Sequence, residues 1–252
     1  MLMNKKAEQL GLKNTHFVTP HGLDEEEHYT TAYELGIIAD YALNIEKISE
    51  IVKTKSYQVM INNNSKTITN TNELLGYLDG VNGVKTGFTN GAGRCLVTSV
   101  NRNGFNIITV VLGADTKKIR TKDSIKLIEY IYSNYELVDL KKLISEEFDY
   151  WNKINKKRVY IYKGKKQNVD IKLGEYKYNI YPVKKEEIKD INIEIQEVQT
   201  YFEAPIYKNT QIGILKLKIK ETELMNIQLL TNEDIKRKDT KDYFVELIRD
   251  FI

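Results

Sequence analysis

The sequence predicts two domains of different class: an α/β domain, built as an antiparallel sheet with helices, followed by a small all-β domain. The chain has 252 residues, enough for one large or two modest domains. Segments with helical spacing surround a three-stranded meander in the first half, and short runs of alternating apolar and polar residues dominate the second. The hydrophobic fraction of 41% is enough for a packed core, which excludes general disorder.

Composition excludes several classes of function. The net charge of +3 is small against 38 basic and 35 acidic residues, so no nucleic-acid-binding footprint is expected. The one cysteine, Cys95, cannot form an internal disulfide, and its strand context predicts a packed, unreactive thiol. His16, His21 and His28 share one loop without the spacing of ligands on a helix, so we expect no metal and no cofactor.

The first predicted elements are helices. Apolar side chains at helical spacing over residues 3–10, followed by Gly11 as a C-terminal cap, predict the last turns of a helix whose beginning is cut away. Thr31 and Glu34 form a capping box, with an apolar face behind it, which predicts a helix over 31–43.

A short helix over 45–52 and a strand pair over 57–61 and 66–69, around a turn of four residues, come next. Asn103-Gly104 then joins two apolar, β-branched runs, which is the strongest short-range hairpin signal. These runs continue a meander that starts at residue 83. A helix over roughly 118–134 would cover the sheet, and its sheet-facing residues are Ile125, Ile128, Ile131 and Tyr132.

The meander begins with the tripeptide Lys85-Thr86-Gly87. The lysine supplies a positive charge, the threonine hydroxyl can hydrogen-bond a carboxylate, and glycine lets another backbone lie against the strand. Together they suit the grip of an extended peptide by its carboxyl end. The tripeptide alone is common, and its simplest interpretation is a strand-ending turn.

The second half carries the alternation of half-buried antiparallel strands, over 159–162, 169–173, 191–195 and 213–219. We predict a first domain over 1–136, a linker over 137–146, an all-β domain over 147–232 and an amphipathic tail helix over 233–252. The apolar stripe of that tail consists of Tyr243, Phe244, Leu247, Ile248, Phe251 and Ile252. Its polar face is not rich in lysine or arginine, so membrane contact through 239–252 and packing against the β domain both stay open.

Several blocks, in order, resemble the serine D-alanyl-D-alanine carboxypeptidases, which are low-molecular-mass penicillin-binding proteins. The blocks are residues 14–24, 30–35, 83–89, 92–93, 112–114 and Arg120, with a looser match at 203–207 and 212–213. The resemblance implies an incomplete penicillin-binding/β-lactamase-like transpeptidase domain followed by that family's β-rich domain. A β-lactamase is disfavoured because the appended domain resembles the carboxypeptidases.

The resemblance also implies roles for individual residues. In such enzymes a serine attacks the penultimate D-alanine carbonyl of a peptidoglycan stem peptide, terminal D-alanine leaves, and water clears the acyl-enzyme. Lys85 and Thr86 would hold the terminal carboxylate, Gly87 would allow strand-like docking, and Arg120 would pair with the same carboxylate. The backbone N–H of Phe88, where some members carry histidine, would form half of the oxyanion hole.

The nucleophile of the family has no counterpart in this sequence. None of the seven serines has lysine three positions later, so the Ser-x-x-Lys motif is missing. Ser99-Val100-Asn101 has the residue types of Ser-x-Asn, but it follows Lys-Thr-Gly instead of preceding it. We therefore interpret it as a strand-terminal turn. We therefore assign no catalytic residue here and expect the nucleophile upstream of Met1. The chain is predicted to be a truncated, inactive portion of a peptidoglycan carboxypeptidase; the alternative is a non-catalytic, wall-associated binding module.

Partners and location follow from the resemblance. They are stem peptides ending in D-Ala-D-Ala and, in the complete enzyme, β-lactams, with no nucleic acid. The family works outside the cytoplasmic membrane, whereas the first residues here are too short and too polar for an export signal.

Overall fold

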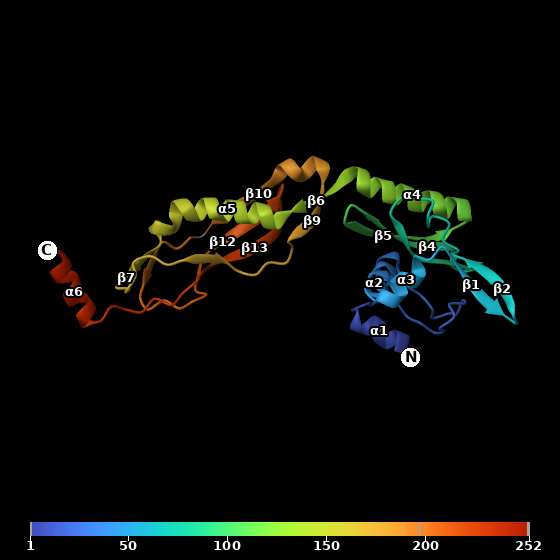
Figure 1. Ribbon diagram of the computed structural model, residues 1–252, viewed down its shortest axis with the longest axis horizontal. Helices are drawn as coiled ribbons and strands as arrows, with labels where there is room; N and C mark the ends of the chain where they lie inside the picture. The colour runs from blue at the N-terminus through green and yellow to red at the C-terminus, as the bar shows by residue number, and fades with distance from the viewer. Residues whose placement is uncertain (1, 197, 251–252) are drawn as a thin grey trace. The chain divides into compact units, whose positions relative to one another are not determined.

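The computed structural model describes residues 2–196 and 198–250. The chain divides into two compact units, Met1–Ser133 and Asn134–Ile252 (Figure 1). Each unit has its own sheets and helices.

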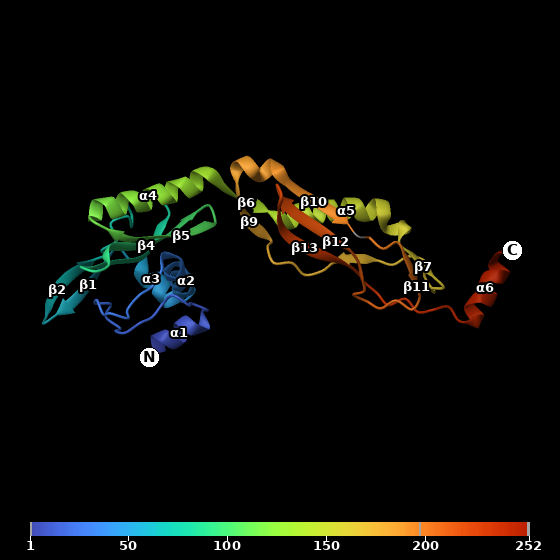
Figure 2. The same cartoon turned by 180° about the vertical axis from the view of Figure 1, so that it is seen from behind.

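The first unit is built on an antiparallel sheet of three strands in the order β3 (Val81–Thr89), β4 (Gly93–Arg102) and β5 (Phe105–Ala114). Helix α4 (Lys117–Asn134) lies on one face, and α2 (Ala32–Leu43) and α3 (Glu46–Val52) lie on the other (Figures 1 and 2). Asn103 and Gly104 both have positive φ, as a two-residue hairpin turn requires, so the predicted hairpin is confirmed.

The α4 face of this sheet is densely packed. Leu96 and Val100 of β4 lie against Ile128 of α4 and Leu74, and all four are fully buried. Ile125 and Tyr132 pack at the edge of the group, as predicted. The hydroxyl of Tyr132 donates to backbone carbonyls of both β4 and β5, which fixes α4 on the sheet. On the other face α2 and α3 approach closely, because Gly83 leaves room for side chains of both helices.

The remaining elements of the first unit follow the predicted order. Helix α1 (Leu2–Gln9) ends at Gly11, whose φ of +73° is the left-handed cap expected there. Strands β1 (Ser56–Ile61) and β2 (Asn64–Thr69) form an isolated hairpin. The turn between them is shorter than predicted, because Asn62 and Asn63 both adopt positive φ and close it in two residues.

The second unit holds β6 (Tyr135–Asp139) paired with β9 (Ile180–Lys184), and β7 (Tyr160–Tyr162) paired in parallel with β11 (Tyr201–Glu203). Its largest sheet has four strands in the order β10 (Ile191–Gln196), β12 (Gln211–Ile219), β13 (Thr222–Thr231) and β8 (Ile171–Leu173). Two 3₁₀ helices, η1 (Lys156–Arg158) and η2 (Lys185–Asp190), complete it.

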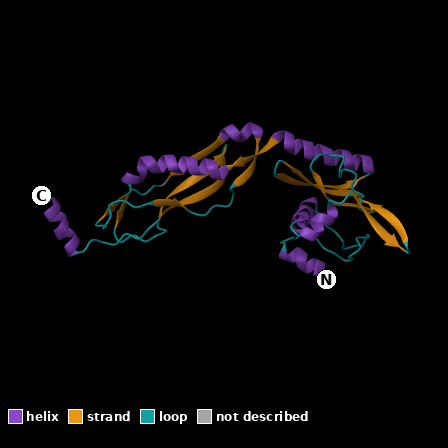
Figure 3. Ribbon diagram, viewed as in Figure 1, coloured by secondary structure: helices purple, strands orange, loops and turns teal. Residues whose placement is uncertain are grey.

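Helix α5 (Leu140–Asn155) corrects the prediction of a linker over 137–146, because those residues form the end of β6 and the first turns of α5 (Figure 3). Leu140, Ile144 and Phe148 are buried in the same core as the strands. Their i, i+4, i+8 spacing is the helical signal that would have identified α5.

The tail helix α6 spans Thr240–Asp250, a shorter segment than the predicted 233–252. Tyr243, Phe244, Leu247 and Ile248 of the predicted stripe are all exposed, while Phe251 and Ile252 lie outside the described residues. Within the described chain, no helix has the length and apolar character to cross a membrane.

Candidate functional site

The Lys-Thr-Gly tripeptide lies in β3, which pairs with β4 alone and forms an edge of its sheet. Thr86 is paired with Leu96, so its side chain lies on the face that α4 covers. Lys85 and Gly87 alternate with it, so they lie on the face of Gly83, which α2 and α3 approach, but both residues are exposed. The two side chains that we expect to grip a carboxylate therefore leave the strand on opposite faces.

Thr86 is tied to the segment that precedes β3. Its hydroxyl lies 2.6 Å from the hydroxyl of Thr71. The next residue, Asn72, is buried and donates from its side-chain amide to the carbonyl of Gly83 at 3.0 Å. These contacts hold residues 71–73 alongside the edge strand.

Arg120 lies in the first turn of α4 and is only 2% exposed. Its Nη2 lies 3.1 Å from Oε2 of Glu73, and the other oxygen of that carboxylate, Oε1, accepts a hydrogen bond from the hydroxyl of Thr121. The contact between Arg120 and Glu73 is close enough for an ion pair, but its angles do not meet hydrogen-bond geometry. Nε and Nη2 of Arg120 are both buried and have no hydrogen-bond partner within the described chain. These two nitrogens form one edge of the guanidinium, the edge that binds a carboxylate in bidentate fashion.

Lys85, Gly87 and Phe88 are the exposed members of the predicted set. The ammonium of Lys85 donates to the carbonyl of Thr86. The ring of Phe88 is 53% exposed. Arg94 in β4 is paired with Phe88, and its guanidinium lies 3.6 Å from the ring centroid. Sequence reasoning missed Arg94, although its position opposite Phe88 follows from the hairpin register.

The loop that contains residues 14–24 reaches the far end of β3. The carboxylate of Asp24 accepts from the N–H of Gly91 at 3.1 Å, and hydrogen bonds from the Thr89 side chain and from Gly91 lower the pKa of Asp24. A Cβ on Gly91 would lie about 3.2 Å from that carboxylate, so glycine fits best. The structure thus brings together two blocks that are 67 residues apart in sequence.

Glu34 fixes the start of the same loop. Its buried carboxylate accepts from the N–H groups of Lys13 and Asn14, both at 2.9 Å, and from the hydroxyl of Thr15 at 2.5 Å. Burial by itself would raise the pKa of Glu34, but these hydrogen bonds outweigh it and the pKa is lowered. The predicted capping box is half correct: Thr31 accepts from the Glu34 N–H, whereas the Glu34 side chain turns to the loop.

A groove of about 760 Å³ lies between α2 and the α2-facing side of the sheet, with Asp40, Ser99 and Asn106 among its lining residues. Ser99 is buried within β4, and the side chain of Asn101 accepts from the N–H of Gly104 in the hairpin turn. The structure corrects the prediction of a turn at Ser99-Val100-Asn101: these residues lie within β4 and pair with β5, and the turn itself is formed by Asn103 and Gly104.

His16 and His28 form hydrogen bonds with backbone groups of the loop that contains them. Nδ1 of His16 lies 2.7 Å from the carbonyl of Glu27, and Nδ1 of His28 accepts from the N–H of Val18. Within residues 2–196 and 198–250, no three His, Cys, Asp or Glu side chains gather as a metal site would require. Cys95 is half-buried, with its thiol directed at the carbonyl of Ala92.

Comparison with known proteins identifies both parts of the chain. Residues 1–116 match the family described as D-alanyl-D-alanine carboxypeptidase, and residues 139–237 match the C-terminal domain of penicillin-binding protein 5. The D-alanyl-D-alanine carboxypeptidase DacF of Bacillus subtilis is 35% identical over 93% of this chain and 58% of that protein. DacA of Haemophilus influenzae is 31% identical over 91% of this chain and 56% of its own length.

A solved structure agrees with these matches. Penicillin-binding protein 5 from Haemophilus influenzae superposes with a TM-score of 0.67 and 27% identity, covering 94% of this chain and 65% of that one. The chain spans a little over half the length of the curated relatives it matches. With both of its units matched, the chain belongs to the D-alanyl-D-alanine carboxypeptidase family.

Proposed function

We propose that this chain supplies the Lys-Thr-Gly side of the substrate site of a serine-type D-Ala-D-Ala carboxypeptidase, which trims peptidoglycan stem peptides outside the cytoplasmic membrane. In this proposal the substrate lies along the free edge of β3 as an added strand, with Gly87 leaving room for its backbone. Thr86 and Arg120, on the α4 face, hold its terminal carboxylate, and Lys85, on the opposite face of β3, adds positive charge to the strand edge along which the substrate lies. The N–H of Phe88 polarises the carbonyl under attack.

The observation that carries the proposal is the unused edge of Arg120. Nε and Nη2 of this buried guanidinium lack aligned hydrogen bonds, which is costly, and a substrate carboxylate that displaced Glu73 would satisfy both donors at once. Glu73 neutralises the arginine without occupying those hydrogen bonds. The contacts from Thr86 to Thr71 and from Glu73 to Arg120 connect the edge strand to this donor pair through three consecutive residues.

The proposal separates binding from turnover. Hydrolysis needs a serine made nucleophilic by a neighbouring base, and no serine in this sequence has lysine three positions later. Because the members of such a catalytic set act together, losing the nucleophile removes nearly all activity. The polypeptide by itself is therefore proposed to bind D-Ala-D-Ala termini without cleaving them and without forming a penicilloyl adduct.

Two measurements test this proposal. Incubation with a fluorescent penicillin followed by denaturing electrophoresis should leave the chain unlabelled, and a covalent band would overturn the proposed inactivity. Fluorescence polarisation should show binding of a dye-labelled peptide ending in D-Ala-D-Ala, and its C-terminal amide should bind at least about tenfold more weakly, because it lacks the charge for Arg120.

Matched lysine variants sharpen the binding measurement. Lys85→Ala should weaken the free-acid peptide by roughly tenfold. Lys118→Ala, which removes an exposed lysine of α4, should leave its affinity unchanged. Equal losses in both variants, or equal affinity for the acid and the amide, would refute the assigned carboxylate grip.

Peripheral membrane contact through residues 239–252 is part of the same proposal. Phe244, Val245, Leu247 and Ile248 of α6 are 46–65% exposed, an apolar surface that suits the interface of a bilayer. Co-sedimentation with anionic vesicles should decrease in the double variant Phe244→Asp/Leu247→Asp. Unchanged sedimentation would exclude α6 as the contact.

A further inference from the structure

Three tyrosines form an exposed aromatic surface on the parallel pair β7 and β11. Tyr160 is in register with Tyr201, and Tyr162 follows two residues later on the same face of β7. The ring centroids of Tyr160 and Tyr201 are 6.3 Å apart with 28° between planes, and those of Tyr162 and Tyr201 are 6.0 Å apart with 27°. These rings stack on one another, and we call them the tyrosine face.

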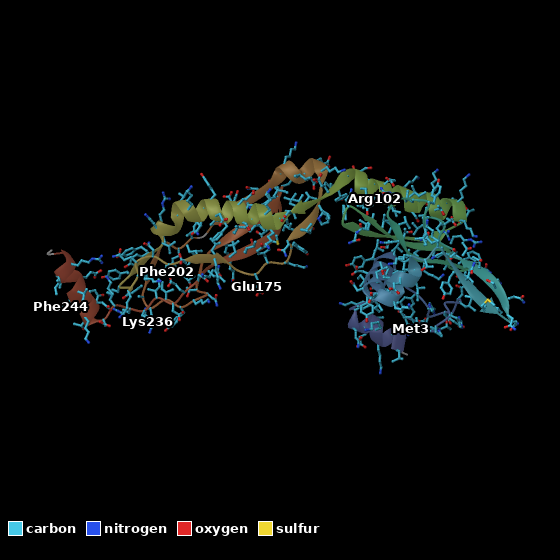
Figure 4. All side chains as sticks on the ribbon, viewed as in Figure 1. Met3, Arg102, Glu175, Phe202, Lys236 and Phe244 are labelled. Carbon is cyan, nitrogen blue, oxygen red and sulfur yellow. The ribbon has the colours of Figure 1, made fainter. Side chains whose placement is uncertain are left out.

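The tyrosine face has a rigid support. Ile161 is fully buried between Tyr160 and Tyr162, and Phe202, labelled in Figure 4, packs against the core of the second unit. The three tyrosines themselves are 39–55% exposed. Contiguous exposed aromatic surface usually marks a binding site, and rings that are already fixed lose little conformational entropy when a ligand lies on them. The tyrosine face therefore suits a ligand with flat, apolar faces.

Charged side chains border the tyrosine face. Nζ of Lys163 lies 4.7 Å from the ring centroid of Tyr162 and 3.0 Å from Oε1 of Glu203. Nη2 of Arg237 lies 3.3 Å from the same oxygen. Two cations against one carboxylate leave this border net positive. Together with the phenol hydroxyls, it offers donors and acceptors to a polyhydroxylated ligand and a positive partner to an acidic one.

We propose that the tyrosine face binds an acidic amino-sugar polymer, the chemistry of a peptidoglycan glycan strand. The aliphatic C–H face of a pyranose ring packs on the exposed aromatic rings, while its hydroxyl and acetamido groups reach the polar border. A carboxylate on the sugar pairs with Lys163 or Arg237. This ligand is the sugar chain rather than the stem peptide, so the inference does not depend on the Lys-Thr-Gly site.

The test uses the full chain and a soluble tetrasaccharide of alternating N-acetylglucosamine and N-acetylmuramic acid without stem peptides, with affinity measured by calorimetry. Tyr201→Ala should weaken binding by about tenfold, since aromatic stacking contributes on that scale. Tyr201→Phe keeps the ring and should remain within about threefold of the wild type. Tyr207→Ala removes an exposed tyrosine outside the face and should change nothing.

Further arms separate the charge contribution and the binding location. Lys163→Ala should weaken the acidic tetrasaccharide but not neutral tetra-N-acetylglucosamine, which lacks the carboxylate. Lys85→Ala should bind both sugars as the wild type does. Weaker sugar binding in this variant would show that the sugar binds to the first unit, and it would overturn the proposal. Absence of binding at millimolar sugar, or equal losses in Tyr201→Ala and Tyr207→Ala, would overturn it as well. Unchanged fluorescence of Trp151 verifies that the second unit, which carries the tyrosine face, is folded in each variant.

Discussion

The two units differ most in how they bury apolar surface. Among the described residues, the core of the second unit joins sixteen buried hydrophobic side chains from α5, from the strands of two sheets and from the segments that connect them. The corresponding group beneath α4 in the first unit has four members, and the opposite face of that sheet borders a groove. Apolar burial is the main driving force of folding. We therefore expect the unit with the candidate site to be the less stable one.

The largest expected effect comes from Ile128→Ala in the first unit. Ile128 is fully buried, and truncating such a side chain costs about 2–5 kcal/mol. In a core of four members, we expect this loss to unfold the first unit while the second stays folded. When urea unfolding of this variant is monitored by circular dichroism, the transition at lower urea concentration, which belongs to the first unit, should be missing.

The matched control is Leu127→Ala, which truncates an exposed neighbour on the same helix. The fluorescence of Trp151, the single tryptophan, reports the second unit because its ring packs on that core. If Ile128→Ala shifts the Trp151 transition as much as the circular dichroism transition, the units do not differ as described.

Leu217→Ala makes the converse change in β12, where Leu217 is fully buried. The cost again lies at about 2–5 kcal/mol, but the larger core should keep the second unit folded in water and lower only its urea midpoint. Trp151 fluorescence measures that midpoint. Complete loss of the native Trp151 signal without urea would show that the second unit has no such reserve.

Arg102 offers a smaller, polar test in the first unit (labelled in Figure 4). It forms two hydrogen bonds to the carboxylate of Glu129, at 2.7 and 3.2 Å, and its guanidinium lies 4.6 Å from the ring centroid of Tyr132. Removing a partly buried bidentate pair costs about 1–3 kcal/mol, so Arg102→Ala should lower the first transition.

A double-mutant cycle with Glu129→Gln isolates the pair itself, since both residues contact other groups. Arg102→Lys should recover only part of the loss, because an ammonium cannot make the bidentate contact. Full recovery by lysine would show that charge alone matters at this position.

The smallest effect concerns pH and Glu34. Its pKa in the folded state lies below its ordinary value of 4.5. The carboxylate therefore stabilises the first unit above that value, and this contribution is lost as the pH falls through the folded pKa. The urea midpoint of the first transition should drop between about pH 5 and pH 3.

Glu34→Gln should lower that midpoint at pH 7 and reduce its dependence on pH. Glu46→Gln, at an exposed carboxylate of α3, is the control and should leave the pH profile as in the wild type. A wild-type pH profile in Glu34→Gln would show that the buried carboxylate does not couple protonation to folding.

Local signals in the sequence predicted most elements of the first unit. The Thr31 cap, the glycine cap at Gly11 and the Asn103-Gly104 turn each specify a backbone geometry by themselves, and each was confirmed. Helix α5 was not predicted, because the strand-like alternation of the following segments is the stronger pattern there and the helical spacing of Leu140, Ile144 and Phe148 rests on only three residues.

The site was less predictable because it depends on contacts between distant segments. The tripeptide and Arg120 were identified through family resemblance, but nothing local indicates that Glu73 lies beside Arg120 or that Glu34 holds the loop at Lys13. The opposite faces of Lys85 and Thr86 follow from strand alternation once β3 is known to be extended. The roles of these residues in binding stay a proposal.

The central claim is that the edge strand of the less stable unit retains the grip on D-Ala-D-Ala termini. Backbone amide NMR of the whole chain, titrated with a peptide ending in D-Ala-D-Ala, tests it most directly. We predict shifts at Gly87 and Phe88 of β3 and around Arg120, with the strands of the second unit unchanged. Saturating millimolar peptide that leaves β3 unshifted, or shifts only the second unit, would contradict the account.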